Sequence, residues 1–199
     1  MIHAHNILML PGWGNSGPAH WQSLWAQHYG YSRVEQHDWD RPLRGDWVTR
    51  LEDAIRQSNG PCVLVAHSLA CHLVTAWAAL SPNPRKVHAA LLVAPPDLQR
   101  DELSAPLHSW VRPDRLARPS LPFKSLLVAS RDDPHCAAVL ARQFATAWGS
   151  EFVDAGALGH INTASHLGDW PAGHALLTAL CAQPVSEPHF PKKGTTTSW

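Results

Sequence analysis

Ser68 stands where a buried strand pattern meets a helical pattern. The apolar run before it ends in His67, and an alanine-rich segment with helical periodicity follows at once. A serine in such a strand-to-helix turn can be held with its hydroxyl exposed above a sheet, where it acts as a nucleophile. Small residues, Ala66 and Ala70, flank the turn, as the close approach of strand and helix requires. A helix N-capped by an ordinary serine has a similar pattern, so this segment alone leaves both interpretations open.

Two later strand patterns are followed by an acid and a base. Asp132 and Asp133 come after the apolar run 125–129, and His160 lies in a glycine-containing loop after the run 151–154. In α/β sheets the functional side chains gather outside the carboxyl ends of the strands. Serine, aspartate and histidine also occur here in the order in which the α/β-hydrolase fold places its catalytic triad. Together, these patterns predict a Ser-His-Asp constellation.

Neighbouring residues provide alternatives for two of these roles. Asp132 is the second candidate for the acid. The alternative interpretation is that Asp132 is a solvated turn residue. We expect His67 to be structural, because side chains next to such a serine point away from its hydroxyl. His166 and His174 compete with His160, but they lie on or near the last helical pattern rather than in a strand-end loop.

The loop after the first strand pattern is rich in glycine. In the α/β-hydrolase fold, a loop of this kind gives one backbone N–H to the oxyanion hole, and the residue after the nucleophile gives the other. Trp13 and Leu69 are therefore the candidate donors. Gly12, Gly14 and Gly17 also match the dinucleotide motif G-x-G-x-x-G. We consider that alternative weaker, because the second strand is short and the triad pattern follows downstream.

Charge and composition narrow the range of partners. The 199-residue chain has 16 basic and 16 acidic side chains, so we expect neither a nucleic-acid nor a membrane partner. No apolar run approaches the roughly 20 residues of a membrane span. The N-terminus lacks a signal-peptide pattern, and the expected location is therefore the cytoplasm. The four scattered cysteines are expected to be reduced and mostly buried.

Histidines are numerous, yet their spacing does not indicate a metal site. The chain has 14 of them, but no H-E-x-x-H motif, no C-x-x-C pair and no compact ligand cluster. We therefore expect no metal and no other cofactor. The ten tryptophans lie mainly in helical patterns or near turns, and most are expected to pack in the core.

Strand and helix patterns alternate along the chain, which predicts an α/β fold: a three-layer sandwich with a mostly parallel sheet of about six strands and helices on both faces. The expected strands are 7–10, 33–36, 62–66, 89–93, 125–129 and 151–154, and the expected helices are 19–29, 47–58, 69–80, 137–148 and 170–181. Asp46 is the expected N-cap of the second helix.

Two segments depart from this alternation. The proline-containing excursion 97–123 has room for about one helical turn near 107–111, and it is too short for a separate cap domain. We expect residues 1–182 to form a single domain and 183–199 to be a mobile C-terminal tail.

The chain resembles the retinoblastoma-binding-protein-nine/YdeN family of small serine hydrolases over about residues 6–181. The pieces that carry the resemblance are PGWGNS at 11–16 with His20-Trp21, AHSLA at 66–70, SRDDP at 130–134, and GHIN at 159–162 with Trp170-Pro171. The resemblance implies a compact α/β-hydrolase without a large cap, with Ser68, Asp133 and His160 as the triad. Ala70 is a departure, since many relatives have glycine there. The family's association with retinoblastoma protein does not carry over, because no L-x-C-x-E peptide is present.

The expected function is that of an esterase-like serine hydrolase. It would cleave a small, uncharged acyl ester or amide through an acyl-enzyme intermediate. A catalytically inactive protein that keeps the fold as an interaction module is the alternative. The sequence does not separate a hydrolase from an acyltransferase or a carbon–carbon hydrolase, and it indicates no protein partner.

Overall fold

A six-stranded sheet, parallel throughout, forms the centre of the molecule, with the strand order β2-β1-β3-β4-β5-β6. The computed structural model describes residues 3–100, 103–111 and 120–182. The strands are β1 (Ile7–Leu10), β2 (Ser32–Arg33), β3 (Cys62–His67), β4 (Val87–Val93), β5 (Lys124–Ala129) and β6 (Glu151–Asp154). The predicted α/β architecture is confirmed.

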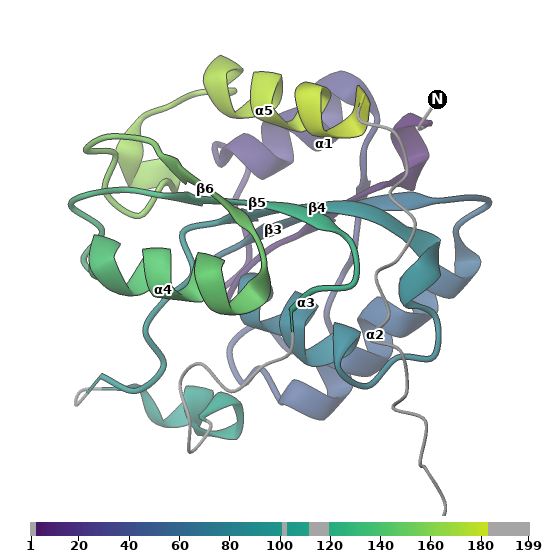
Figure 1. The fold of residues 1–199 in the computed structure, drawn as a ribbon, viewed down its shortest axis with the longest axis horizontal. Helices are drawn as coiled ribbons and strands as arrows, with labels where there is room; N and C mark the ends of the chain where they lie inside the picture. Colours follow the sequence, from purple (N-terminus) through teal and green to yellow (C-terminus); the bar gives the residue numbers. More distant parts are fainter. Residues whose placement is uncertain (1–2, 101–102, 112–119, 183–199) are drawn as a thin grey trace, which may run out of the picture.

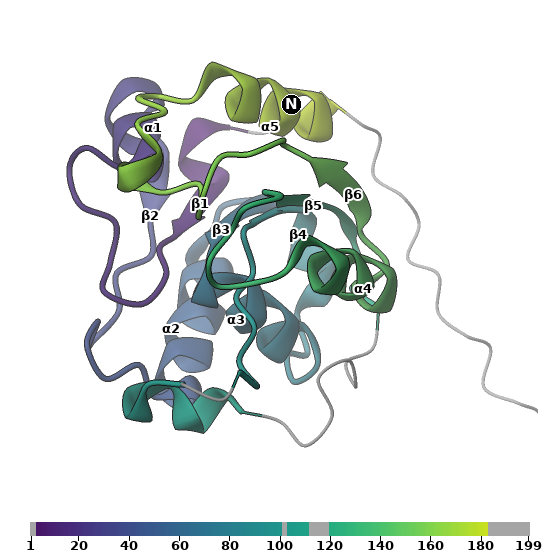
Figure 2. The same ribbon diagram turned by 90° about the vertical axis from the view of Figure 1, so that its left-hand side faces the viewer.

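Helices cover both faces of this sheet. Helices α1 and α5 lie on one face and α2, α3 and α4 on the other, as both ribbon views show (Figures 1 and 2). Their bounds are α1 (Trp21–Tyr29), α2 (Arg44–Gln57), α3 (Leu69–Ala78), α4 (Ala138–Trp148) and α5 (Pro171–Ala182). No helix among the described residues is long and apolar enough to cross a membrane.

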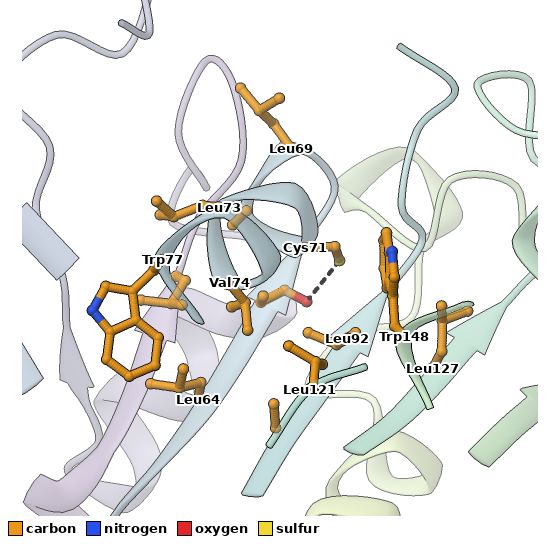
Figure 3. Close-up of a cluster of buried hydrophobic side chains, with 14 of the residues drawn as sticks. Leu64, Leu69, Cys71, Leu73, Val74, Trp77, Leu92, Leu121, Leu127 and Trp148 are labelled. Carbon is orange, nitrogen blue, oxygen red and sulfur yellow. Dashed lines mark hydrogen bonds between the residues drawn. The ribbon is translucent and has the colours of Figure 1, made fainter. Parts of the chain in front are cut away.

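The sheet separates two hydrophobic cores. Alternate residues of a strand face opposite sides, so in β3 Val63 contributes to the core under α1 and α5, while Leu64 contributes to the other. The second core is drawn in Figure 3, where α3 lies on the sheet. Six tryptophans are fully buried, which agrees with the expected core role: Trp21, Trp25, Trp47, Trp77, Trp110 and Trp148.

The order of the strands reverses direction at one place. From β1 the chain moves outward to β2, and then returns to add β3 on the other side of β1. The loops that leave β1 and β3 therefore run to opposite faces of the sheet. Ligands of open α/β sheets bind at such a switch point, outside the carboxyl ends of the strands.

Two predicted boundaries were wrong by three residues, and the other predicted bounds differ by two residues or fewer. Both larger errors have a tertiary cause. The second strand, expected at 33–36, is Ser32–Arg33 and lies at the edge of the sheet. Helix α2 begins at Arg44, with Leu43 rather than Asp46 at the N-cap, and Asp46 lies in its first turn. The Arg44 N–H instead donates to Ser109 Oγ, at 3.3 Å, from a distant segment.

That distant segment belongs to the excursion after β4. A 3-10 helix, η3 (Ala105–Trp110), forms near the expected helical turn. Trp110 anchors it, since the indole is buried and its Nε1 donates to the Pro42 carbonyl at 2.6 Å. No cap domain is inserted within the described ranges. Residues 101–102 and 112–119 of the excursion, and the tail expected at 183–199, lie outside them.

Candidate active site

Ser68 occupies a sharp turn between β3 and α3. Its backbone has φ 56° and ψ −125°, a conformation that L-residues rarely adopt. The Ser68 N–H donates to the Val93 carbonyl at 2.9 Å, and the serine carbonyl accepts from the Cys71 N–H at the start of α3. Ala66 and Ala70 are completely buried on either side. The turn is therefore held by packed backbone, and small residues make that packing possible.

The loop after β1 lies directly against this turn. A Cβ on Gly12 would come within 2.9 Å of both the His67 carbonyl oxygen and Ser68 Cβ, and within 3.4 Å of the Leu69 nitrogen. Only glycine permits so close an approach. Within the described residues, the backbone N–H groups of Trp13 and Leu69 have no hydrogen-bond acceptor. The two expected oxyanion donors are thus unpaired, and they belong to segments that touch.

His160 and Asp133 complete a continuous chain of hydrogen bonds to Ser68. His160 Nδ1 lies 3.0 and 2.9 Å from the two carboxylate oxygens of Asp133, and His160 Nε2 lies 2.9 Å from Ser68 Oγ. Both partners are desolvated, since their side chains are 9% and 3% exposed. An Nδ1–H that donates to the carboxylate leaves Nε2 as an acceptor for the serine proton. The structure brings together the three residues expected from the sequence.

Asp132 holds the backbone of the histidine loop instead of the imidazole. Its Oδ1 accepts from the Gly159 N–H at 2.8 Å and from Ser130 Oγ at 2.6 Å. Ser130 Oγ in turn accepts from the Leu158 N–H at 2.8 Å. These hydrogen bonds keep the pKa of Asp132 below its usual value, with the one from Ser130 contributing most. Ser130 was not among the residues expected at the site, although its place directly after β5 was an available signal.

His67 links the turn to the same loop. Its Nε2–H donates to the backbone carbonyl of His160 at 2.9 Å. Burial, reinforced by the nearby His20 and His160, lowers the pKa of His67 well below 6.5. The ring is therefore neutral and serves to fix the position of the base.

The other candidate histidines lie apart from Ser68. His174 Nε2 is 2.8 Å from the Tyr31 hydroxyl, and its ring stacks on Tyr29 at 4.0 Å. His166 follows a short 3-10 helix (Thr163–Ser165) in a left-handed conformation. Neither joins the hydrogen-bonded chain.

Features expected of a nucleotide or metal site are not found in the described parts. The glycine loop does not open a helix, because α1 begins only at Trp21, and Gly12 instead serves the approach to Ser68. No group of three or more His, Cys, Asp or Glu side chains in those parts could hold a metal ion. Cys62, Cys71 and Cys136 are buried, Cys181 is half-buried, and none of the four forms a disulfide within the described residues.

A family model described as serine hydrolase matches residues 7–179. The chain belongs to the serine hydrolase family. The resemblance seen in the sequence motifs is thereby confirmed. No curated protein matches the chain.

Solved structures of similar proteins agree with this placement. A YdeN-like hydrolase from Pectobacterium atrosepticum is 26% identical, with a TM-score of 0.76 over 87% of this serine hydrolase and 89% of that chain. The ydeN product of Bacillus subtilis is 16% identical, with a TM-score of 0.70 over 89% and 98% of the two chains. Est1E from Butyrivibrio proteoclasticus, solved with ferulic acid bound, is 11% identical, with a TM-score of 0.65 over 89% of each chain. The last two similarities concern the fold alone.

Proposed function

We propose that this serine hydrolase cleaves a small acyl ester or amide, with Ser68 as nucleophile, His160 as general base and Asp133 as the acid that orients it. The observation that carries the proposal is the unbroken chain from Ser68 Oγ through the imidazole to the Asp133 carboxylate. It lies at the carboxyl ends of β3, β5 and β6. Because all three strands belong to one sheet, we also propose that residues 1–182 act as one domain.

In the first half of the reaction, Ser68 Oγ attacks the acyl carbon and His160 Nε2 takes the hydroxyl proton. Asp133 stabilises the resulting imidazolium. The bond to the leaving alcohol or amine then breaks, and His160 returns the proton to that group. In the second half, His160 activates a water molecule, which attacks the acyl-enzyme and releases the carboxylic acid together with free Ser68.

Negative charge develops on the acyl oxygen during both attacks. The unpaired N–H groups of Trp13 and Leu69 supply the donors for it in this proposal. The loss of one such donor costs about 3–4 kcal/mol of transition-state stabilisation in comparable sites. Backbone donors of this kind need no reorganisation, because the contact of Gly12 with the turn already fixes their segments.

The choice of a small ester is supported by the surroundings and by similar folds. No cap domain covers the site within the described residues. Est1E was solved with ferulic acid, a small aromatic acid, and the structurally similar CarC is a serine hydrolase involved in carbazole degradation. Both proteins have a fold similar to that of this chain, and one is bound to a small molecule while the other is a serine hydrolase of a degradation pathway. These similarities support a small substrate.

A fluorophosphonate probe tests the proposal directly, because it labels only activated serines. We expect the wild-type protein to be labelled, Ser68→Ala to be unlabelled, and His160→Ala to react about a hundredfold or more slowly. Ser150→Ala is the matched control, since this serine precedes the edge strand β6 and its hydroxyl pairs with that of Ser125. A wild-type protein that fails to react would contradict the proposal and favour an interaction module.

A further inference from the structure

Arg100 carries a charge that has no carboxylate partner within the described part of the chain. Of its five N–H donors, only one on Nη1 has an acceptor there, which is His135 Nδ1 at 2.9 Å, and Nε is buried without any. Burying a charged N–H without an acceptor is costly. Arg100 therefore has donor capacity that an anionic ligand could use.

His135 connects this guanidinium to the proposed triad. Because arginine can only donate, His135 Nδ1 is an acceptor, and the ring is held as the neutral Nε2–H tautomer. The backbone N–H of His135 donates to Asp133 Oδ1 at 2.8 Å. Its ring packs edge-on against His160, with 4.5 Å between the ring centroids. Arg100 thus lies one side chain away from the base.

A cavity of about 520 Å³ opens beside Arg100. Leu98, Leu103 and Val111 provide apolar walls, while Gln99, Arg100 and His108 provide the polar groups. A mostly apolar pocket with a few polar groups is typical of small-molecule sites. Such a pocket accommodates a short hydrocarbon chain and leaves a cation to meet the end of that chain.

The carboxylates near Arg100 are occupied in other ways. Asp133 is shared between the His160 ring and the His135 backbone. Asp97 Oδ1 accepts from the Gln99 N–H at 2.9 Å. Asp101 and Glu102 follow Arg100 in the sequence, and neutralisation of the guanidinium by either of them would appear as a preference for a cationic ester.

We propose that the cavity beside Arg100 is a substrate subsite for a carboxylate, so that the preferred esters carry a carboxylate group in addition to the bond that is cleaved. This inference rests on the proposed function and names its substrate class, which replaces the uncharged ester expected from composition. The carboxylate would accept from the free guanidinium N–H groups, and it would neutralise a cation that otherwise opposes formation of the His160 imidazolium.

Matched esters test the subsite by kcat/KM. On the acyl side, three para-nitrophenyl esters of equal chain length are compared. The adipate monoester ends in a carboxylate, the hexanoate ends in a methyl group, and the 6-aminohexanoate ends in an ammonium group. On the alcohol side, para-carboxyphenyl acetate is compared with its carboxamide. We expect the anionic ester to be preferred about tenfold or more in at least one pair, as a charge-assisted hydrogen bond allows.

Two variants and one control assign the preference to Arg100. Arg100→Gln should abolish it, so that the anionic and neutral esters are hydrolysed with equal kcat/KM, and Arg100→Lys should keep part of it. Arg142→Gln removes the same charge from α4, where the guanidinium lies over the Phe152 ring, and should leave the preference unchanged. Equal rates for anionic and neutral esters, a preference for the cationic ester, or a preference that survives Arg100→Gln would each overturn the proposal.

Binding to Ser68→Ala keeps this test independent of turnover. We expect calorimetric titration to show monomethyl adipate binding more tightly than methyl hexanoate, and the difference should disappear in the Ser68→Ala/Arg100→Gln double variant. If no ester is hydrolysed but this difference is seen, the proposed reaction is wrong and the subsite stands. If esters are hydrolysed and no difference is seen, the subsite is wrong and the reaction stands.

Discussion

The turn that carries Ser68 and the loop that carries His160 are held in different ways. Ala66 and Ala70 around the serine are fully buried, and Gly12 touches the turn through backbone contact. None of residues 155–160 is fully buried, and polar groups from Ser130 and Asp132 fix the backbone of that loop. Packing therefore positions the proposed nucleophile, while hydrogen bonds position the proposed base.

This contrast predicts that the Ser68 turn and the His160 loop respond to different kinds of substitution. Packed positions respond to changes of volume, because interiors are dense and yield little. Hydrogen-bonded positions respond to loss of an acceptor or of a charge. Paired variants separate these effects. In each pair, one substitution disturbs the region concerned and the matched substitution leaves that region intact.

The largest effect is expected from the two adjacent aspartates after β5, which contact the histidine loop. Asp133→Asn removes the charge that stabilises the imidazolium and allows the wrong tautomer, so kcat should fall roughly 10³–10⁴-fold. Asp132→Asn keeps an oxygen acceptor for Ser130 and Gly159, and kcat should fall less than about tenfold. Ester hydrolysis measured on both variants checks this. Equal losses would mean that the acid had been assigned to the wrong aspartate.

A smaller effect is expected from the glycine that contacts the turn. Gly12→Ala would place a methyl group 2.9 Å from the His67 carbonyl and from Ser68 Cβ, so the turn must shift. We expect about 1–3 kcal/mol of destabilisation and about a hundredfold loss of kcat/KM. Denaturant unfolding measures the loss of stability, and ester hydrolysis measures the loss of kcat/KM.

Gly17→Ala is the counterpart of this change. A Cβ there would meet no atom within 4 Å, and the backbone conformation suits alanine. Its stability should stay within about 0.5 kcal/mol of the wild type. If the stability of Gly12→Ala also stayed this close to that of the wild type, the turn at Ser68 would be more deformable than its packing indicates.

The last effect concerns how stability depends on pH through His20, which packs against His67. Burial lowers the pKa of His20 from 6.5 to about 4, and His20 packs edge-on against His67 at 4.8 Å. The unfolded chain therefore binds a proton below pH 6.5 that the folded chain resists. Protonation of the unfolded chain therefore lowers the free energy of unfolding as the pH falls from 6.5 toward 4. Above pH 6.5 this loss is absent, and its full size is at most about 3 kcal/mol.

His20→Asn isolates that contribution. Asparagine keeps the N-cap acceptor that His20 Nδ1 provides to the Gln22 N–H, but it does not titrate. Melting temperatures between pH 7 and pH 4 should fall less steeply in the variant than in the wild type. Parallel curves would show that His20 is not the group whose protonation destabilises the fold.

Local patterns were enough to predict the main features of the fold. Strands β1 and β6 have the predicted bounds. The reason is clearest in β1, because a buried parallel strand is a continuous apolar run that ends at a turn. Ser68, Asp133 and His160 could be proposed because each follows such a run, where the topology gathers functional side chains. The roles of these residues remain proposals.

Features set by long-range contacts could not be predicted in the same way. The start of α2 depends on Ser109, which is 65 residues away. The edge strand β2 is short, although the Val34 N–H still donates to the Met9 carbonyl beyond its end. Ser130, His135 and Arg100 acquire their significance only through partners that folding brings to them. No periodicity or spacing in the sequence expresses such contacts.

The hydrogen bond between Ser68 and His160 has a consequence for the order of folding. The two residues are 92 positions apart, and β5 and β6 must both join the sheet before the imidazole reaches the serine. Contacts so distant in sequence form late, because the entropy of closing the intervening chain must be overcome first. If Ser68 is the nucleophile, as proposed, the turn between β3 and α3 emerges during biosynthesis with an ordinary hydroxyl, and activation by His160 begins only when β6 joins the sheet.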